Sequence, residues 1–371
     1  MNTPPAPRFR ALDGLRGLAA LFVVFSHILD TTPAFHQATA HPSTRASGLF
    51  TQALLYSPLH DLWNGTVAVY IFFVLSGFVL TVPLLSSKNP HPWRSFYPKR
   101  LVRLYLPVIA AALFALALTA TPHPAPTSVA PWISSWFQAG TWPHALRAMS
   151  LLFSPGSLNP SLWTLRPELA LSMALPVFVL LAKNLQNRAR LAALLSTACI
   201  ILAALANSQP VTLTACFCVG TLLASSKDTL ATLTKSPRWW RALLFAALLG
   251  VNAEWFGYFV ALHLPSLTLA VVLVSAATLV LAALSYPPLS SWLNRPVLSW
   301  LGTRSFSLYL VHVPVVVLCA TYLPRALWAL LVAATAGSLA AAEVFYRLIE
   351  RPSHRAANAV GQWASSSHFG R

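Results

Sequence analysis

The sequence predicts an all-α integral membrane protein with about ten transmembrane helices and both termini in the cytoplasm. Two properties of its composition indicate this class: 56% of the 371 residues are hydrophobic and only 9% are charged, and the mean hydropathy is +0.63. Soluble globular proteins carry about 25% charged residues. A third observation is that the basic residues occur in short clusters between apolar stretches.

Apolar stretches of the length needed to cross the hydrocarbon core, about 20 residues each, recur through the chain. The fifth and sixth of these stretches are short, and Asn252 and Glu254 interrupt the seventh. We predict spans near residues 11–30, 64–85, 102–121, 162–182, 191–206, 211–225, 241–258, 264–284, 303–321 and 326–346.

The basic residues predict the orientation of these spans. If the N-terminus is cytoplasmic, the loops on that side contain Lys88, Arg94, Lys99, Arg100, Arg103, Lys183, Arg188, Arg190, Lys227, Lys235, Arg238, Arg241, Arg295 and Arg304. The loops on the opposite side contain Arg45, Arg147 and Arg325. Because cytoplasmic loops are enriched in Lys and Arg, this asymmetry predicts an even number of spans with both ends inside.

Other classes of protein fit the composition poorly. The formal net charge of +17 does not indicate nucleic-acid binding, because the basic residues are not gathered on one soluble face. The first apolar stretch contains charged residues and lacks a small-residue cleavage site, so we expect no cleavable signal peptide. The cysteines lie in or beside apolar stretches without metal-ligand spacing, so we expect no disulfide framework and no metal site. They are Cys199, Cys216, Cys218 and Cys319.

The first predicted span, LDGLRGLAALFVVFSH at 12–27, carries Asp13, Arg16 and His27. The eleven-residue spacing from Arg16 to His27 is three helical turns plus about 20°, so both lie on one face, roughly 16 Å apart along the axis. Asp13, one turn before Arg16, can pair with its guanidinium. Asp13 and Arg16 alone also fit a helix-end ion pair, with His27 at the interface. Three ionisable groups on one apolar helix favour a functional role.

Two further motifs place charges at the ends of predicted spans. Arg100 and Arg103 stand at i and i+3 at the cytoplasmic end of the third span. This pattern is suited to binding phosphate groups, although Arg100 also fits the orientation signal. Glu168 lies near the outer end of the fourth span beside Arg166, where it is either part of an interfacial ion pair or a catalytic carboxylate.

The ninth predicted span contains His312 in its middle, two residues before Pro314, together with Tyr309. A proline frees a backbone carbonyl of its helix, and His312 could satisfy that carbonyl. The sequence therefore supports a structural role for His312 as well as a catalytic one.

Together these motifs resemble the acyltransferase-3 family of integral membrane O-acyltransferases, which modify sugars of the bacterial cell envelope. The resemblance covers nearly the whole chain, and the Arg–His spacing and the Arg-x-x-Arg pair are specific in combination. The landmarks are FRALDGLRGLAALFVVFSH at 9–27, YIFFVLSGFVLT at 70–81, PKRLVRLYLP at 98–107, SLWTLRPELAL at 161–171, SFSLYLVHVPV at 305–315 and LIERP at 348–352. At Glu168 the chain departs from the family, in which an acidic pair often follows the tryptophan motif.

The resemblance implies transfer of an acyl group, usually acetyl, from cytoplasmic acyl-CoA to a hydroxyl of an extracytoplasmic carbohydrate or glycolipid. It also implies a bacterial cytoplasmic-membrane location and no metal cofactor. We expect a stand-alone acyltransferase domain at 1–350 and a short cytoplasmic tail at 351–371, without the periplasmic esterase-like domain of some members.

The site residues that follow from the motifs and the resemblance fall into three groups. The expected catalytic residues are His27, Arg16, Asp13 and Glu168. The expected acyl-CoA-binding residues are Arg100, Arg103 and Arg16. The expected supporting residues are His312, Tyr309, Ser76 and Trp163.

We expect His27 to act as general base on the acceptor hydroxyl, with Arg16 orienting the donor or stabilising developing negative charge. A covalent acyl-histidine relay is an alternative. A secondary transporter or flippase for an anionic substrate is the alternative function, disfavoured by the lack of an internal repeat. A catalytically inactive membrane partner would leave the three ionisable residues of the first span unexplained.

Overall fold

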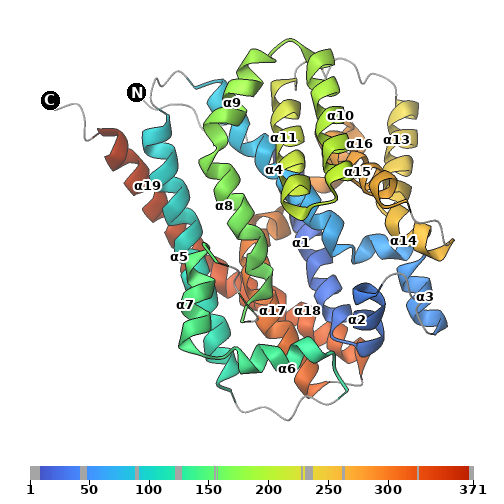
Figure 1. The fold of residues 1–371 in the computed structure, drawn as a ribbon. Helices are drawn as coiled ribbons and strands as arrows, with labels where there is room; N and C mark the ends of the chain where they lie inside the picture. The colour runs from blue at the N-terminus through green and yellow to red at the C-terminus, as the bar shows by residue number, and fades with distance from the viewer. Residues whose placement is uncertain are drawn as a thin grey trace. The chain divides into compact units, whose positions relative to one another are not determined.

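The structure is a computed structural model that describes residues 9–41, 48–87, 92–121, 128–153, 156, 158–226, 229, 237–260, 264–323 and 326–366. The regular secondary structure of these residues is helical throughout, which confirms the all-α class (Figure 1). Several residues used above to predict the orientation lie outside the described residues: Arg45, Lys88, Lys227, Lys235 and Arg325.

The chain divides into two compact units, each described by itself. Three helices, α1, α8 and α17, have residues in both. Unit 1 comprises α1 (Arg10–Asp30) up to Phe22, α3 (Leu49–Leu55), the 3₁₀ turn η1 (Pro58–Leu62), α4 (Gly65–Leu85), α8 (Leu165–Met173) from Leu171, α9 (Leu175–Asn184), α10 (Ala189–Ala206), α11 (Gln209–Ser225), α13 (Pro237–Gly250), α14 (Ala253–Phe259), α15 (Pro265–Ser285), α16 (Pro287–Leu293) and α17 (Pro296–Tyr322) up to Thr303.

Unit 2 contains the remaining helices. It comprises α1 from Val23, α2 (Pro33–Ala40), α5 (Trp93–Thr119), α6 (Pro131–Gln138), α7 (Trp142–Ser150), the 3₁₀ turn η2 (Pro160–Thr164), α8 up to Ala170, α17 from Arg304, α18 (Leu327–Phe345), the π-helical turn η3 (Tyr346–Glu350) and α19 (Arg351–Ser366).

Among the described residues, seven helical segments are long and apolar enough to cross a membrane: α1, α4, α5, α10, α15, α17 and the continuous segment Leu327–Ser366. An eighth consists of Pro160–Met173 followed by Leu175–Asn184, bent by 57°. The other two predicted spans correspond to shorter helices, which are α11, with 17 residues, and α13 followed by α14. The chain is therefore a multi-pass membrane protein, and the count of ten spans stays a prediction.

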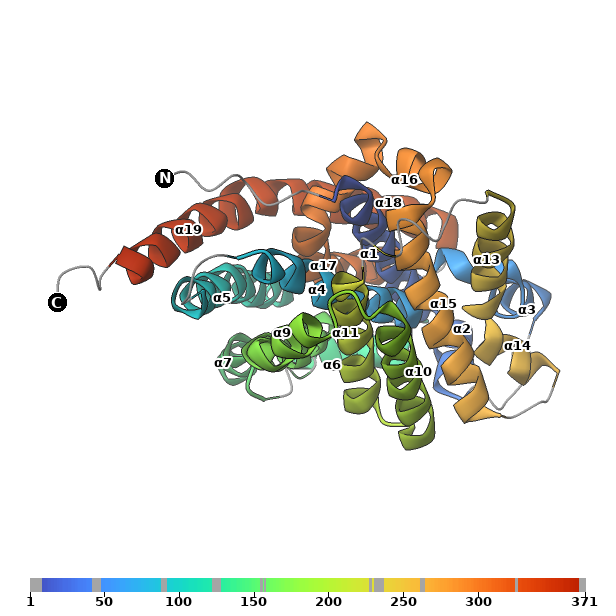
Figure 2. The same ribbon diagram turned by 90° about the horizontal axis from the view of Figure 1, so that it is seen from above.

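Unit 1 is held together by close helix packing at small residues. A Cβ atom added at Gly77 of α4 would lie 2.0 Å from the carbonyl oxygen of Phe217, and one at Gly220 of α11 would lie 2.0 Å from that of Val74. Only glycine permits this backbone approach, which is typical of helix pairs inside membranes. The neighbouring helices α10 and α11 also lie side by side (Figure 1, Figure 2).

In unit 2, α19 packs along α5 (Figure 1). A Cβ atom at Gly361 of α19 would lie 3.2 Å from the Ser95 carbonyl oxygen. The predicted cytoplasmic tail is thus helical from Arg351 to Ser366, and residues 367–371 lie outside the described residues.

The π-helical turn η3 precedes α19 and contains a buried carboxylate. Glu350, 2% exposed, accepts hydrogen bonds from the backbone N–H and the hydroxyl of Ser307. These bonds attach η3 to α17 and satisfy a charge that would be costly to bury alone.

Candidate functional site

Unit 2 brings together the histidines of the first and ninth predicted spans. The Nδ1 atom of His27 on α1 lies 3.4 Å from the Nε2 atom of His312 on α17. Their ring centroids are 5.0 Å apart, with 73° between the ring planes. His312 has no exposed surface, whereas His27 is half-buried. The fully buried imidazole of His312 thus contacts the more accessible imidazole of His27.

The backbone contacts of the two rings define their tautomers. Nδ1 of His312 is 3.1 Å from the Leu308 carbonyl oxygen and 2.9 Å from that of Tyr309. Since a carbonyl oxygen can only accept a hydrogen bond, Nδ1 of His312 carries the proton. Nε2 of the neutral ring then carries a lone pair. Nδ1 of His27 is 2.9 Å from the Val23 carbonyl oxygen, so it also carries the proton and shares it with His312. The remaining nitrogen of His27, Nε2, is therefore the basic one.

The hydrogen bonds around Pro314 in α17 differ from those expected from the sequence. Pro314 lacks the N–H that would bond the Leu310 carbonyl four residues earlier. That carbonyl instead accepts a hydrogen bond of 2.9 Å from the side-chain amide of Asn159. His312 does not satisfy the carbonyl that the proline frees, so this structural explanation for His312 is wrong.

Asn159 belongs to a polar segment that sequence reasoning did not select. The Ser161 hydroxyl donates to Asn159 at 2.7 Å, and the Thr164 and Tyr309 hydroxyls are 2.7 Å apart. All four side chains are buried. Trp163, predicted as a supporting residue, lies in the same turn, η2, and is half-buried. The sequence signal is NPSLWT at 159–164, where Asn159 and Ser161 precede the predicted span 162–182 and Thr164 lies in its first turn.

A second pair in unit 2 joins two predicted site residues from different helices. Nη2 of Arg100 on α5 donates to Oε1 of Glu168 on α8 at 2.5 Å. Since the two ends of a span are about 30 Å apart, the prediction that Arg100 lies at the cytoplasmic end and Glu168 near the outer end of their spans is wrong for at least one of the two. Their side chains are 14% and 24% exposed. Arg103, one turn further along α5, is exposed. Glu168 therefore orients one guanidinium of the Arg-x-x-Arg motif, and both guanidiniums carry the charge needed to bind a phosphate.

The other predicted residues belong to unit 1. Asp13 and Arg16 lie on α1, both half-buried, where α1 closely approaches α17: a Cβ atom at Gly302 would lie 2.2 Å from the Asp13 carbonyl oxygen. Ser76 lies on α4 and is half-buried. Since α1 is helical from Arg10 to Asp30, the spacing that places Arg16 and His27 on one helix face holds. The Asp13–Arg16 ion pair stays a prediction.

The fold and these contacts define a polytopic helical membrane protein that holds ionisable side chains within its apolar helices. Such groups mark catalytic or transport sites. Residues 9–347 match the family model of the acyltransferase-3 domain, described as an acyltransferase domain. The chain belongs to this family. No curated protein and no solved structure matched the chain. The family match confirms the resemblance and favours a membrane acyltransferase over the transporter or flippase alternative.

Proposed function

We propose that this acyltransferase moves an acetyl group from cytoplasmic acetyl-CoA to a hydroxyl of an extracytoplasmic carbohydrate or glycolipid, in a bacterial cytoplasmic membrane. The observation that carries the proposal is the His27–His312 contact, because it leaves Nε2 of His27 as a hydrogen-bond acceptor. A general base needs such a lone pair within reach of the proton that it removes.

In the proposed reaction, Nε2 of His27 takes the proton of the acceptor hydroxyl while its oxygen attacks the thioester carbonyl carbon. A carbon–oxygen bond forms, and collapse of the tetrahedral intermediate breaks the carbon–sulfur bond. The proton on His27 then passes to the departing CoA sulfur. His312 is a positioning residue: its Nε2 lone pair faces Nδ1–H of His27 and stabilises the imidazolium that forms.

The donor would bind through its phosphates, which cannot enter hydrocarbon. Arg100 and Arg103 are one helical turn apart on α5, which suits two guanidiniums contacting neighbouring phosphate groups. Glu168 holds Arg100 in place, so we assign it an orienting role. We assign Arg16, which lies roughly 16 Å from His27 along α1, to orienting the donor at a distance from its thioester, and Asp13 to orienting Arg16.

The proposal is tested by the thermal stability of the purified protein in detergent with and without acetyl-CoA. We expect acetyl-CoA to stabilise wild type and to have little effect on an Arg100→Ala/Arg103→Ala variant. Arg188→Ala/Arg190→Ala, which removes two guanidiniums from another predicted cytoplasmic loop, is the matched control and should respond like wild type. Absence of stabilisation by several acyl-CoAs, with the protein folded, would contradict the proposed donor.

A further inference from the structure

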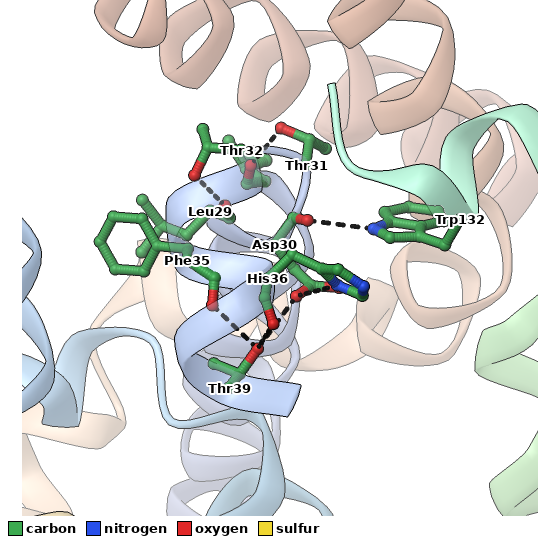
Figure 3. Close-up of polar contacts among 9 residues, drawn as sticks. Leu29, Asp30, Thr31, Thr32, Phe35, His36, Thr39 and Trp132 are labelled. Carbon is green, nitrogen blue, oxygen red and sulfur yellow. Dashed lines mark hydrogen bonds and ion pairs between the residues drawn. The ribbon is translucent and has the colours of Figure 1, made fainter. Parts of the chain in front are cut away.

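The outer end of α1 carries a polar cluster one helical turn beyond His27, formed by Asp30, His36, Thr39 and Trp132 (Figure 3). We call it the Asp30 cluster. All four residues belong to unit 2, as does His27. Asp30 is three residues after His27 on the same helix, roughly 4.5 Å along the axis. The orientation predicted above places this end of α1 on the extracytoplasmic side.

Hydrogen bonds arrange the cluster around one carboxylate oxygen. Nδ1 of His36 is 3.1 Å from Oδ1 of Asp30. The Thr39 hydroxyl lies 3.3 Å from the same oxygen and can donate its one proton there or to the carbonyl oxygens of Phe35 and His36. Within the described part of the chain, Oδ2 of Asp30 makes no hydrogen bond. The Asp30 and His36 side chains are 31% and 32% exposed, so the carboxylate is fixed in orientation and still accessible.

Trp132 of α6 contacts the backbone of Asp30. Its indole N–H donates to the Asp30 carbonyl oxygen at 3.0 Å, and the Ala130 N–H donates to the Thr31 carbonyl oxygen at 2.8 Å. These two bonds attach the start of α6 to the end of α1, and Figure 3 shows the one from Trp132. Trp132 is half-buried, so part of an aromatic side chain is accessible at the residue that carries the carboxylate.

Asp30 lies between two helices. It is the last residue of α1, whose dipole disfavours an acidic side chain there, and it precedes the N-terminus of α2, which favours one. An accessible carboxylate and an aromatic side chain that contacts the same residue together suit a polyhydroxylated molecule. The carboxylate accepts strong hydrogen bonds from hydroxyl groups, and the ring surface attracts the C–H groups of a sugar.

We propose that the Asp30 cluster binds hydroxyl groups of the carbohydrate acceptor, with Asp30 accepting hydrogen bonds from hydroxyls next to the one that is acylated. This inference rests on the proposed acyltransferase reaction and assigns its acceptor subsite. One helical turn separates the subsite from His27, so a sugar bound there presents a neighbouring hydroxyl to the base.

The test measures acetyl transfer by protein in nanodiscs from labelled acetyl-CoA. The acceptors are p-nitrophenyl glycosides of several hexoses, a glycolipid fraction of bacterial membranes, and p-nitrobenzyl alcohol as a non-sugar hydroxyl. Asp30→Asn and Trp132→Leu should each raise KM for the best sugar acceptor about tenfold, the loss of one charged hydrogen bond or one ring contact. KM for acetyl-CoA should stay within about twofold. Asp61→Asn, which alters another hydrogen-bonded aspartate in the outer segment that follows the first predicted span, should behave like wild type.

Two results would overturn the subsite: an unchanged acceptor KM in both variants, or equal use of the non-sugar alcohol by wild type. Transfer to the glycolipid fraction but not to the glycosides would assign the subsite to a lipid-linked sugar. If wild type is stabilised by acetyl-CoA but acetylates no sugar, the subsite is wrong while the donor proposal stands. If it neither binds acetyl-CoA nor transfers, the proposed function fails and the subsite with it.

Discussion

At the scale of single residues, the candidate site depends on which nitrogen of each of the two imidazoles carries the proton. His27 has a proton on Nδ1 because the Val23 carbonyl and the His312 lone pair both face that atom. His312 in turn is fixed by two carbonyls of its own helix. The role of each ring therefore follows from which atom faces a group that can only accept a hydrogen bond.

Substituting the two histidines should have different effects. His27→Ala should lower the rate of transfer about 10²- to 10⁴-fold, the usual contribution of a general base. His312→Leu should lower kcat less, and His312→Gln should recover part of it, because the amide oxygen of glutamine can accept from Nδ1–H of His27. KM for acetyl-CoA should be unchanged in all three. Equal loss in His312→Leu and His312→Gln, with both proteins folded, would contradict the positioning role.

At the scale of elements, the connection between η2 and α17 positions His312. Pro314 interrupts the backbone hydrogen bonds of α17, and Asn159 supplies the missing donor to Leu310. An unsatisfied carbonyl inside a membrane costs several kcal/mol, so the amide and the proline depend on each other.

A double-mutant cycle tests that dependence. Asn159→Ala should destabilise the protein by roughly 1–3 kcal/mol, because it leaves the Leu310 carbonyl without its donor. Pro314→Ala returns a backbone N–H to that carbonyl, so Asn159→Ala should cost less in the Pro314→Ala background. The measurement is the midpoint of thermal unfolding in detergent for all four proteins. Strict additivity would show that the two residues are not coupled through Leu310.

The short element η1, outside the membrane-spanning helices, links stability to pH. Burial lowers the pKa of His60 from 6.5 to about 3. The unfolded chain therefore binds more protons there between those values, and stability decreases as the pH falls. Burial raises the pKa of Asp61 from 3.8 to about 6, against the opposite effect of the hydrogen bond from Asn252. Its folded form binds the proton more tightly, so this contribution increases as the pH falls.

The two contributions oppose each other between about pH 4 and pH 6. In Asp61→Asn the contribution of His60 is no longer compensated, so the unfolding midpoint should fall more steeply on acidification from pH 6 to pH 4 than in wild type. His60→Gln/Asp61→Asn should return the slope of the profile to that of wild type. Parallel profiles for wild type and Asp61→Asn would show that the two groups do not titrate as described.

At the scale of the whole molecule, the predicted orientation places both termini in the cytoplasm. Green fluorescent protein fused after Arg371 should fluoresce in bacteria, while alkaline phosphatase at the same position should be inactive. Alkaline phosphatase fused within 122–142, a predicted outer loop, should be active. Active phosphatase at the C-terminus would require an odd number of spans.

The sequence by itself determined the membrane class, the all-α fold and the family, because these depend on composition, apolar stretches and local motifs. It also predicted His27, Arg100 and Glu168 as site residues, since an ionisable group in or beside an apolar helix stands out. Those roles stay predictions until the experiments above are done.

The tertiary structure alone decided which residues meet. His27 and His312 are 285 residues apart in the chain, and Arg100 and Glu168 are 68 apart, so no local pattern could pair them. Asn159 has an ordinary polar side chain whose role became visible only when the Leu310 carbonyl was located. Side-chain periodicity depends on neighbours within one helix, whereas these contacts depend on how separate helices pack.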